Sequence, residues 1–233
     1  MKAKWMLPVG FLAMATAVVA QQKKGIVVEG GEPDERASAR LLYWDQQADA
    51  SAGQVVIDYG RPEWKKQYED PATFDKLTKG QVWRMGNNYW TTLDTELVVT
   101  IGGRRITPGL YYLGLYRSME GATWALAFIN PTVIRARRMD AFEIAKAPIL
   151  FKTEMTAEKA SATTQKLTFT FSHAPDDIRN ATLKLAWGNM VLTTPVKVIL
   201  TPEARGRARI HPCRKNSDRT GPSSGPAGLR LSG

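Results

Sequence analysis

The sequence predicts an all-β protein, a β-sandwich or related barrel of eight or more mostly antiparallel strands with one short helix. Short segments rich in β-branched and aromatic residues recur along the chain, with Gly, Pro and Asn turns between them. The clearest is the segment KLTFTF at residues 166–171, where apolar residues alternate with threonines as in a half-buried strand. Helical periodicity is convincing in one segment only, so alternating βαβ units are not expected.

The first expected strands lie on either side of turn residues in the N-terminal half. Residues 40–44 and 54–59 read as strands, and the long connection at 63–80 is expected to be helical in part, around 71–79. A hairpin turn at Gly102-Gly103 joins the next two strands. The strands expected up to the helix cover residues 96–101, 104–107, 110–116 and 123–129.

The expected helix covers residues 134–147, and Pro148 would end it. Four further strands follow. They cover residues 149–155, 166–171, 182–187 and 190–200.

Residues 1–20 have the pattern of a cleavable secretion signal. A basic start with Lys2 and Lys4 precedes an uncharged apolar run, and Ala20 or Ala17 suits the peptidase. The run is shorter than the roughly 20 residues that span a bilayer, so an uncleaved anchor is the weaker alternative and no transmembrane segment is expected in the mature chain. No cysteine follows the run that could accept a lipid. We therefore expect a periplasmic or secreted protein.

Charge and composition divide the rest of the chain. Residues 21–38 suit a flexible leader, residues 39–200 the β-sandwich domain, and residues 201–233 a disordered basic tail. Of the net charge of +10, the signal carries +2 and the tail +5, which leaves +3 for the body. An exported domain with so little charge is not expected to bind nucleic acid. The single cysteine, Cys213, excludes an intramolecular disulfide.

Several motifs occur in a fixed order along the body. VVIDYGRP is followed by VWRMGNNYWTT, VTIGGRRITPGLYYLGLY, TWALAFIN, KLTFTF and ATLKLAW. In this order they resemble the bacterial family called domain of unknown function 2911, over about residues 39–198. Gly60, Met85 and Asn88 stand where that family commonly has Ser, Thr and Ala. The resemblance implies an exported, β-rich bacterial domain, and it implies no reaction.

One group of residues is a candidate ligand site. Two arginines flanked by aromatic and amide side chains could bind a carboxylate or phosphate, while an indole packs on a sugar or an apolar ligand. The alternative is structural, with the arginines bound to loop carbonyls and the tryptophans in the core. We favour this alternative, because structural ion-pair networks use the same residue types as binding sites. The candidate residues are Tyr59, Arg61, Trp83, Arg84, Asn87, Asn88 and Trp90.

Patterns for catalysis and cofactors are weak. No cluster of His and Cys has the spacing of a metal site, no G-x-S-x-G motif occurs, and no cofactor is expected. Five carboxylates could contribute to a hydrolase, but nothing selects two of them: Asp58, Asp94, Glu96, Asp140 and Glu143. The sequence thus favours a binding or interaction module over an enzyme. Its partner would be an unknown small ligand or envelope component, such as a glycan or peptide, and an envelope hydrolase or a purely structural domain are the alternatives.

Overall fold

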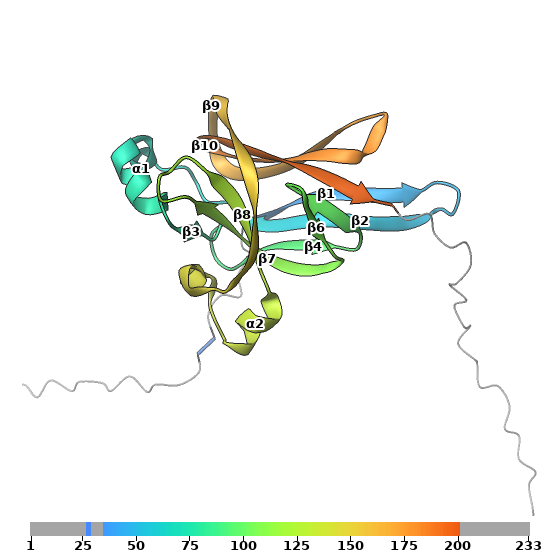
Figure 1. Cartoon of the computed structure of the whole chain (residues 1–233), viewed down its shortest axis with the longest axis horizontal. Coiled ribbons are helices and arrows are strands. Elements are labelled where there is room, and N and C mark those ends of the chain that lie inside the picture. The colour runs from blue at the N-terminus through green and yellow to red at the C-terminus, as the bar shows by residue number, and fades with distance from the viewer. Residues whose placement is uncertain (1–26, 29–34, 201–233) are drawn as a thin grey trace, which may run out of the picture. The chain divides into compact units, whose positions relative to one another are not determined.

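Ten strands and four short helices form the folded part of the chain (Figure 1). The structure is a computed structural model that describes residues 27–28 and 35–200, and every structural statement below refers to these residues. The strands are β1 (Arg36–Asp45), β2 (Ala50–Gly60), β3 (Val82–Trp83), β4 (Thr91–Thr95), β5 (Val98–Ile101), β6 (Arg104–Ile106), β7 (Gly109–Arg117), β8 (Trp124–Ile129), β9 (Ile149–Ala174) and β10 (Asp177–Ile199). The helices are η1 (Lys66–Glu69) and η2 (Ala141–Lys146), both 3₁₀, with α1 (Pro71–Thr78) and α2 (Pro131–Ala136).

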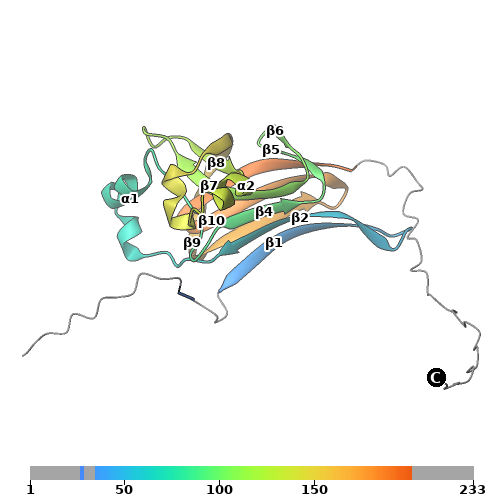
Figure 2. The ribbon, with the colours of Figure 1, turned by 90° about the horizontal axis from the view of Figure 1, so that it is seen from below.

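The strands are antiparallel and follow the order β1-β2-β4-β7-β8-β9-β10-β5-β6. The short strand β3 lies off this path and pairs with β7 near its C-terminal end. The strand β9 connects two layers. Its first residues, from Ile149 to Met155, pair with β8, and from Thr156 onward it pairs with β10. Figure 2 shows β1, β2 and β4 in front of the long hairpin of β9 and β10. The all-β fold predicted from the sequence is confirmed.

A large hydrophobic core lies between the two layers. It contains Ile57 of β2, Leu113 of β7 and Phe128 of β8 together with Leu167 of β9 and Leu185 of β10, all fully buried. Burial alternates along the outer strands but not along β8, where all six residues are buried. A second, smaller core explains this, because α2 and η2 pack on the other side of β7 and β8.

The prediction of one helix over residues 134–147 is wrong, because two separate short helices, α2 and η2, form in this region. Asn130 caps α2 and Asp140 caps η2, and Arg138 between them has a positive φ of 53°. A left-handed residue interrupts the helical hydrogen bonds, and the second cap starts a new helix. The helix expected around residues 71–79 is confirmed as α1, which Asp70 caps through the Thr73 amide.

Several boundaries differ from the sequence prediction, and β4 forms where no strand was expected. The first strand starts at Arg36, inside the predicted leader, because it pairs with β2 as far as Gly60. The segments expected at 149–155 and 166–171 belong to the single strand β9, and those expected at 182–187 and 190–200 belong to the single strand β10. The predicted signal at 1–20 and the predicted tail at 201–233 lie outside the described residues. No helix in the described part of the chain has the length and apolar character needed to cross a bilayer.

Candidate functional site

Tyr59 is part of the core. It is 3% exposed, and its ring meets Phe169 edge-on with centroids 4.8 Å apart. Its hydroxyl accepts a hydrogen bond from the Phe169 amide at 3.0 Å. This bond joins β2 to β9 across the sandwich, so Tyr59 has a structural role.

The two arginines of the predicted site have different partners. Arg61 donates to the Leu167 carbonyl and to the Thr168 hydroxyl on β9, both at 3.3 Å. Arg84 donates to the Asn88 carbonyl at 3.0 Å, and its guanidinium lies 3.8 Å from the ring centroid of Phe142. Burial lowers the pKa of Arg84, and the Asp140 carboxylate partly offsets this. Each arginine is thus engaged by protein groups of its own, as the structural alternative predicts.

The loop before β4 is shaped by backbone geometry. Asn88 has a φ of 69°, a left-handed conformation that Asn adopts more readily than most residues. Asn87 lies so close to Gly60 that a β-carbon at position 60 would overlap the Asn87 side chain. Trp90 is 6% exposed and stacks on Tyr112 with centroids 4.7 Å apart. These three positions therefore hold the loop against the sheet.

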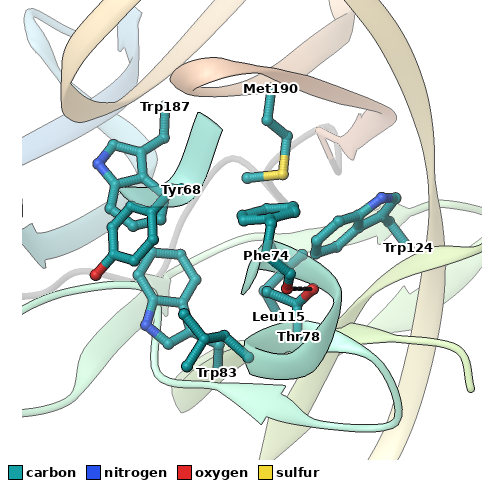
Figure 3. A pocket seen from close by; sticks show the side chains of 9 residues that line it. Tyr68, Phe74, Thr78, Trp83, Leu115, Trp124, Trp187 and Met190 are labelled. Atoms are coloured by element: carbon teal, nitrogen blue, oxygen red, sulfur yellow. Dashed lines mark hydrogen bonds between the residues drawn. The ribbon is translucent and has the colours of Figure 1, made fainter. Parts of the chain in front are cut away.

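Trp83 is the member of the predicted group that reaches a cavity. It lies at the edge of a pocket of about 170 Å³ where η1 and α1 meet both layers of the sandwich (Figure 3). We call this the aromatic pocket. Its lining residues are Tyr68, Phe74, Leu77, Thr78, Trp83, Leu115, Trp124, Trp187 and Met190.

Six elements supply these side chains. Tyr68 comes from η1, Phe74, Leu77 and Thr78 come from α1, and the others come from β3, β7, β8 and β10. Helix α1 presents Phe74 to the pocket, and the Thr78 hydroxyl donates to the Phe74 carbonyl at 2.7 Å (Figure 3). In the same view, Met190 and Thr78 lie on opposite sides of the Phe74 ring. The pocket thus depends on a helix that contributes no buried residue of its own.

An ion-pair network fastens α1 to the sheet. The Asp75 carboxylate accepts from Lys79 Nζ and from Arg117 on β7, each at 2.7 Å. These bonds lower the pKa of Asp75, the Lys79 bond most strongly. The Arg117 guanidinium also lies 5.0 Å from the Trp124 ring centroid and 5.6 Å from that of Phe74. A cation is therefore already present beside two walls of the pocket.

A stack of indoles forms the opposite wall. Trp83 and Trp187 stack at 4.8 Å, and Trp64 meets Trp187 edge-on at 5.0 Å. Trp187 Nε1 donates to the Pro62 carbonyl at 2.8 Å, which fixes its ring. Gly188 lets Trp64 approach, because a β-carbon there would overlap the Trp64 ring. Each indole of this wall packs against another aromatic side chain.

The lining residues include no charged side chain, and most are apolar. The Thr78 hydroxyl is already engaged by Phe74 and by Arg117. None of the five candidate carboxylates lines the pocket, and the described residues contain no cluster of three His, Cys, Asp or Glu that could hold a metal. The arrangement is suited to binding an apolar group, and its lining hydroxyls are those of Tyr68 and Thr78.

Sequence analysis missed most of this pocket. Tyr68 and Phe74 lie in the connection after β2, which is too long for a simple turn. The length of this connection was the one sign in the sequence that it covers part of the sandwich. Trp124, Trp187 and Met190 read as ordinary strand residues, and only the pairing of β8 with β9 and of β9 with β10 brings them together.

The fold and the pocket define a class of protein, a β-sandwich with an aromatic pocket at one end. The family model described as Protein of unknown function (DUF2911) matches residues 45–196, more than half of the chain, so the chain belongs to this family. This confirms the resemblance seen in the sequence, and the matched residues include the whole aromatic pocket. No curated protein and no solved structure matches the chain.

Proposed function

We propose that the protein is an exported binding module that receives a neutral apolar group in the aromatic pocket. The observation that carries this proposal is the lining, which combines five aromatic side chains with Leu77, Leu115 and Met190 and has no charged side chain. Apolar pockets with few polar groups are the usual form of small-ligand sites. Export rests on the signal pattern of residues 1–20.

The pocket volume limits what can enter. At about 170 Å³ it resembles an apolar cavity of roughly 150 Å³ that binds benzene. Sites for whole drug-sized ligands are larger, roughly 300–1,000 Å³. The pocket therefore suits one aromatic ring or a short hydrocarbon segment of a larger molecule, such as a peptide side chain or an acyl chain of an envelope component.

The charge of Arg117 selects against cations. Aromatic faces attract cations, but Arg117 already lies 5.0 Å from Trp124 and 5.6 Å from Phe74. A second cation in the pocket would be repelled by this guanidinium. Neutral groups meet no such repulsion.

A sugar is a poorer occupant than an apolar group. Trp83 and Trp187 cover each other's faces with planes 15° apart, so these two facing surfaces are not free for a sugar ring. Sugar hydroxyls also need hydrogen-bond partners when they are buried. The mostly apolar lining supplies few such partners.

The proposal is tested by following the indole N–H signals of the protein in two-dimensional NMR spectra. Toluene and 1-hexanol serve as neutral probes and tetramethylammonium as the cation, and Trp→Phe variants assign the indole signals of the six tryptophans that follow the predicted signal. We expect both neutral probes to shift the signals of Trp83, Trp124 and Trp187, and tetramethylammonium to leave them in place.

Two exposed leucines provide a variant and its matched control. Leu77, 50% exposed, lines the pocket, and Leu42, 45% exposed, lies on β1 outside it. We expect Leu77→Lys to weaken toluene binding about tenfold, the effect of about 1.4 kcal/mol. Leu42→Lys should leave toluene binding unchanged. Shifts that miss the three indoles, or equal effects of the two variants, would contradict the proposal.

A further inference from the structure

A second hollow adjoins the aromatic pocket. It has a volume of about 270 Å³ and shares with the pocket the side chains of Tyr68, Phe74 and Met190, which Figure 3 shows. Its other lining residues are Trp64, Glu69, Pro71, Asp75, Arg117 and Asn189. We call it the polar hollow, because it contains the charged and amide groups that the aromatic pocket lacks. A ligand that fills the pocket and extends past the shared side chains enters the polar hollow.

Glu69 is the unengaged carboxylate of the polar hollow. Within the described part of the chain it forms no ion pair, whereas Asp75 is bound by Lys79 and Arg117. Glu69 is exposed and directly follows Tyr68 in η1, so it lies close to a ring that lines both hollows. This carboxylate is therefore available to a positively charged group of a ligand.

The charge balance of the polar hollow differs from that of the aromatic pocket. Arg117 lies beside both, but Asp75 and Glu69 line the polar hollow and not the pocket, and Lys79 lines neither. The lining of the polar hollow thus contains two carboxylates and one guanidinium. An ammonium group that Arg117 would repel from the pocket meets an excess of negative charge in the polar hollow.

Asn189 supplies a hydrogen-bond donor beside this charge. Its Oδ1 accepts from the Thr163 hydroxyl at 2.9 Å, which leaves the Nδ2 hydrogens for another acceptor. Asn189 is exposed, and the next residue, Met190, lines both hollows. A carbonyl oxygen of a ligand is a suitable partner for Nδ2.

We propose that the two hollows together bind the N-terminal residue of a peptide. Its apolar side chain occupies the aromatic pocket, its α-ammonium group binds Glu69, and its carbonyl oxygen accepts from Asn189. An N-terminal residue carries these three groups close together, as the adjoining hollows require. An internal peptide residue lacks the ammonium group. The inference rests on the proposed function and adds to it the chemical class of the ligand.

The test compares two ligands that differ by one ammonium group, on the full chain. L-Phenylalaninamide has the ring, the ammonium group and the carbonyl, and 3-phenylpropionamide has a hydrogen in place of the ammonium group. Titrations that follow the indole signals of Trp83, Trp124 and Trp187 give both dissociation constants at pH 6, where an α-amino group with a pKa of about 7.7–8.0 is protonated. We expect L-phenylalaninamide to bind about fivefold more tightly at low salt, which corresponds to about 1 kcal/mol. The preference should shrink at high salt.

Two variants that each remove one negative charge locate the ammonium site. Glu69 lines the polar hollow, whereas Asp176 is exposed in the turn between β9 and β10, outside both hollows. We expect Glu69→Gln to abolish the fivefold preference and Asp176→Asn to retain it. Equal losses in the two variants would show that overall charge sets the preference, and would overturn the proposal.

A third ligand tests the carbonyl contact. 2-Phenylethylamine has the ring and the ammonium group but no carbonyl. We expect the wild type to bind L-phenylalaninamide about threefold more tightly than 2-phenylethylamine, and Asn189→Ala to bind the two equally. An unchanged ratio in Asn189→Ala would overturn the assignment of a peptide N-terminus.

The outcomes distinguish this inference from the proposed function. If neither L-phenylalaninamide nor 3-phenylpropionamide shifts the three indole signals, the proposed function fails and the inference fails with it. If both ligands shift the signals with equal affinity, the aromatic pocket stands as a binding site, and the inference of a peptide N-terminus alone is overturned.

Discussion

Trp83 of β3 stacks on Trp187 of β10, with ring centroids 4.8 Å and planes 15° apart, and this pair joins the two layers of the sandwich at the aromatic pocket. Trp187 also donates its Nε1 hydrogen to the Pro62 carbonyl. Trp187→Phe removes this bond and part of the stack. We expect it to lower the free energy of unfolding by about 1–3 kcal/mol, measured by denaturant titration.

Trp44→Phe is the matched control for this change. Trp44 is half-exposed on β1, and exposed substitutions usually stay within about 0.5 kcal/mol. Equal losses for the two variants would show that the Trp83–Trp187 pair has no special role in joining the layers.

Gly188→Ala should be the most disruptive glycine substitution near the pocket. Gly188 has a φ of 58°, and a β-carbon there would overlap the Trp64 ring. Gly103→Ala is the control, because Gly103 has a φ of 80° and a β-carbon at that position would meet no other atom within 4 Å. Both variants meet the backbone penalty of roughly 1 kcal/mol, and only Gly188→Ala also displaces an indole.

The difference in stability between these two glycine variants measures the cost of displacing the Trp64 indole. We expect Gly188→Ala to unfold at a lower denaturant concentration than Gly103→Ala, with a free energy of unfolding lower by at least about 1 kcal/mol, and to move the Trp64 indole signal. A control that is destabilised as much as Gly188→Ala would refute the packing explanation.

The fold was predictable because its signals are local. KLTFTF alternates in sequence and does so in β9, where Leu167 and Phe169 are buried and their neighbours are not. Gly102 and Gly103 predicted a turn between β5 and β6, and both have the positive φ that such turns require. The prediction failed on the continuity of the long strands. No local pattern shows that residues 149–174 form one strand that passes from one layer to the other.

The candidate site was harder to predict because it depends on distant pairing. The sequence motif around Trp83 and Arg84 suggested a common site, yet β3 turns Trp83 to the pocket while Arg84 contacts Phe142 of η2. Neighbours in a strand point to opposite faces, so adjacent residues rarely share a site. Trp187 reaches Trp83 across more than a hundred residues, and only the assembled sandwich reveals this contact.

Arg84 offers a direct test of its structural role. Its bond to the Asn88 carbonyl and its contact with Phe142 should make Arg84→Ala less stable by about 1–2 kcal/mol, while toluene binding is unchanged. If Arg84 instead bound an anionic ligand, phosphate would stabilise the wild type and not the variant. Denaturant titrations with and without phosphate distinguish the two roles, and we expect phosphate to make no difference between them.

Acid should loosen α1 through Asp75. Its carboxylate accepts from Lys79 and Arg117, which hold the pKa below the usual 3.8 in the folded protein. A group whose pKa is lowered on folding stabilises the protein above its unfolded pKa, and this stabilisation is lost as the pH falls through the folded value. Asp75→Asn cannot take up that proton. We therefore expect it to be less stable than the wild type at neutral pH, and to lose less stability on acidification below about pH 4.

Hydrogen exchange of the α1 amides locates this effect. In the wild type, the protection of the α1 amides relative to their intrinsic exchange rates should fall as the pH falls below about 4, and in Asp75→Asn this protection should already be low at neutral pH. Asp177→Asn is the control, because the pKa of Asp177 is also lowered, chiefly by Asn180, but Asp177 is the first residue of β10 and has no bond to α1. That variant should change the pH dependence of unfolding without changing exchange from α1. Identical α1 exchange in Asp75→Asn and the wild type at every pH would mean that the ion pairs with Lys79 and Arg117 do not hold the helix over the pocket.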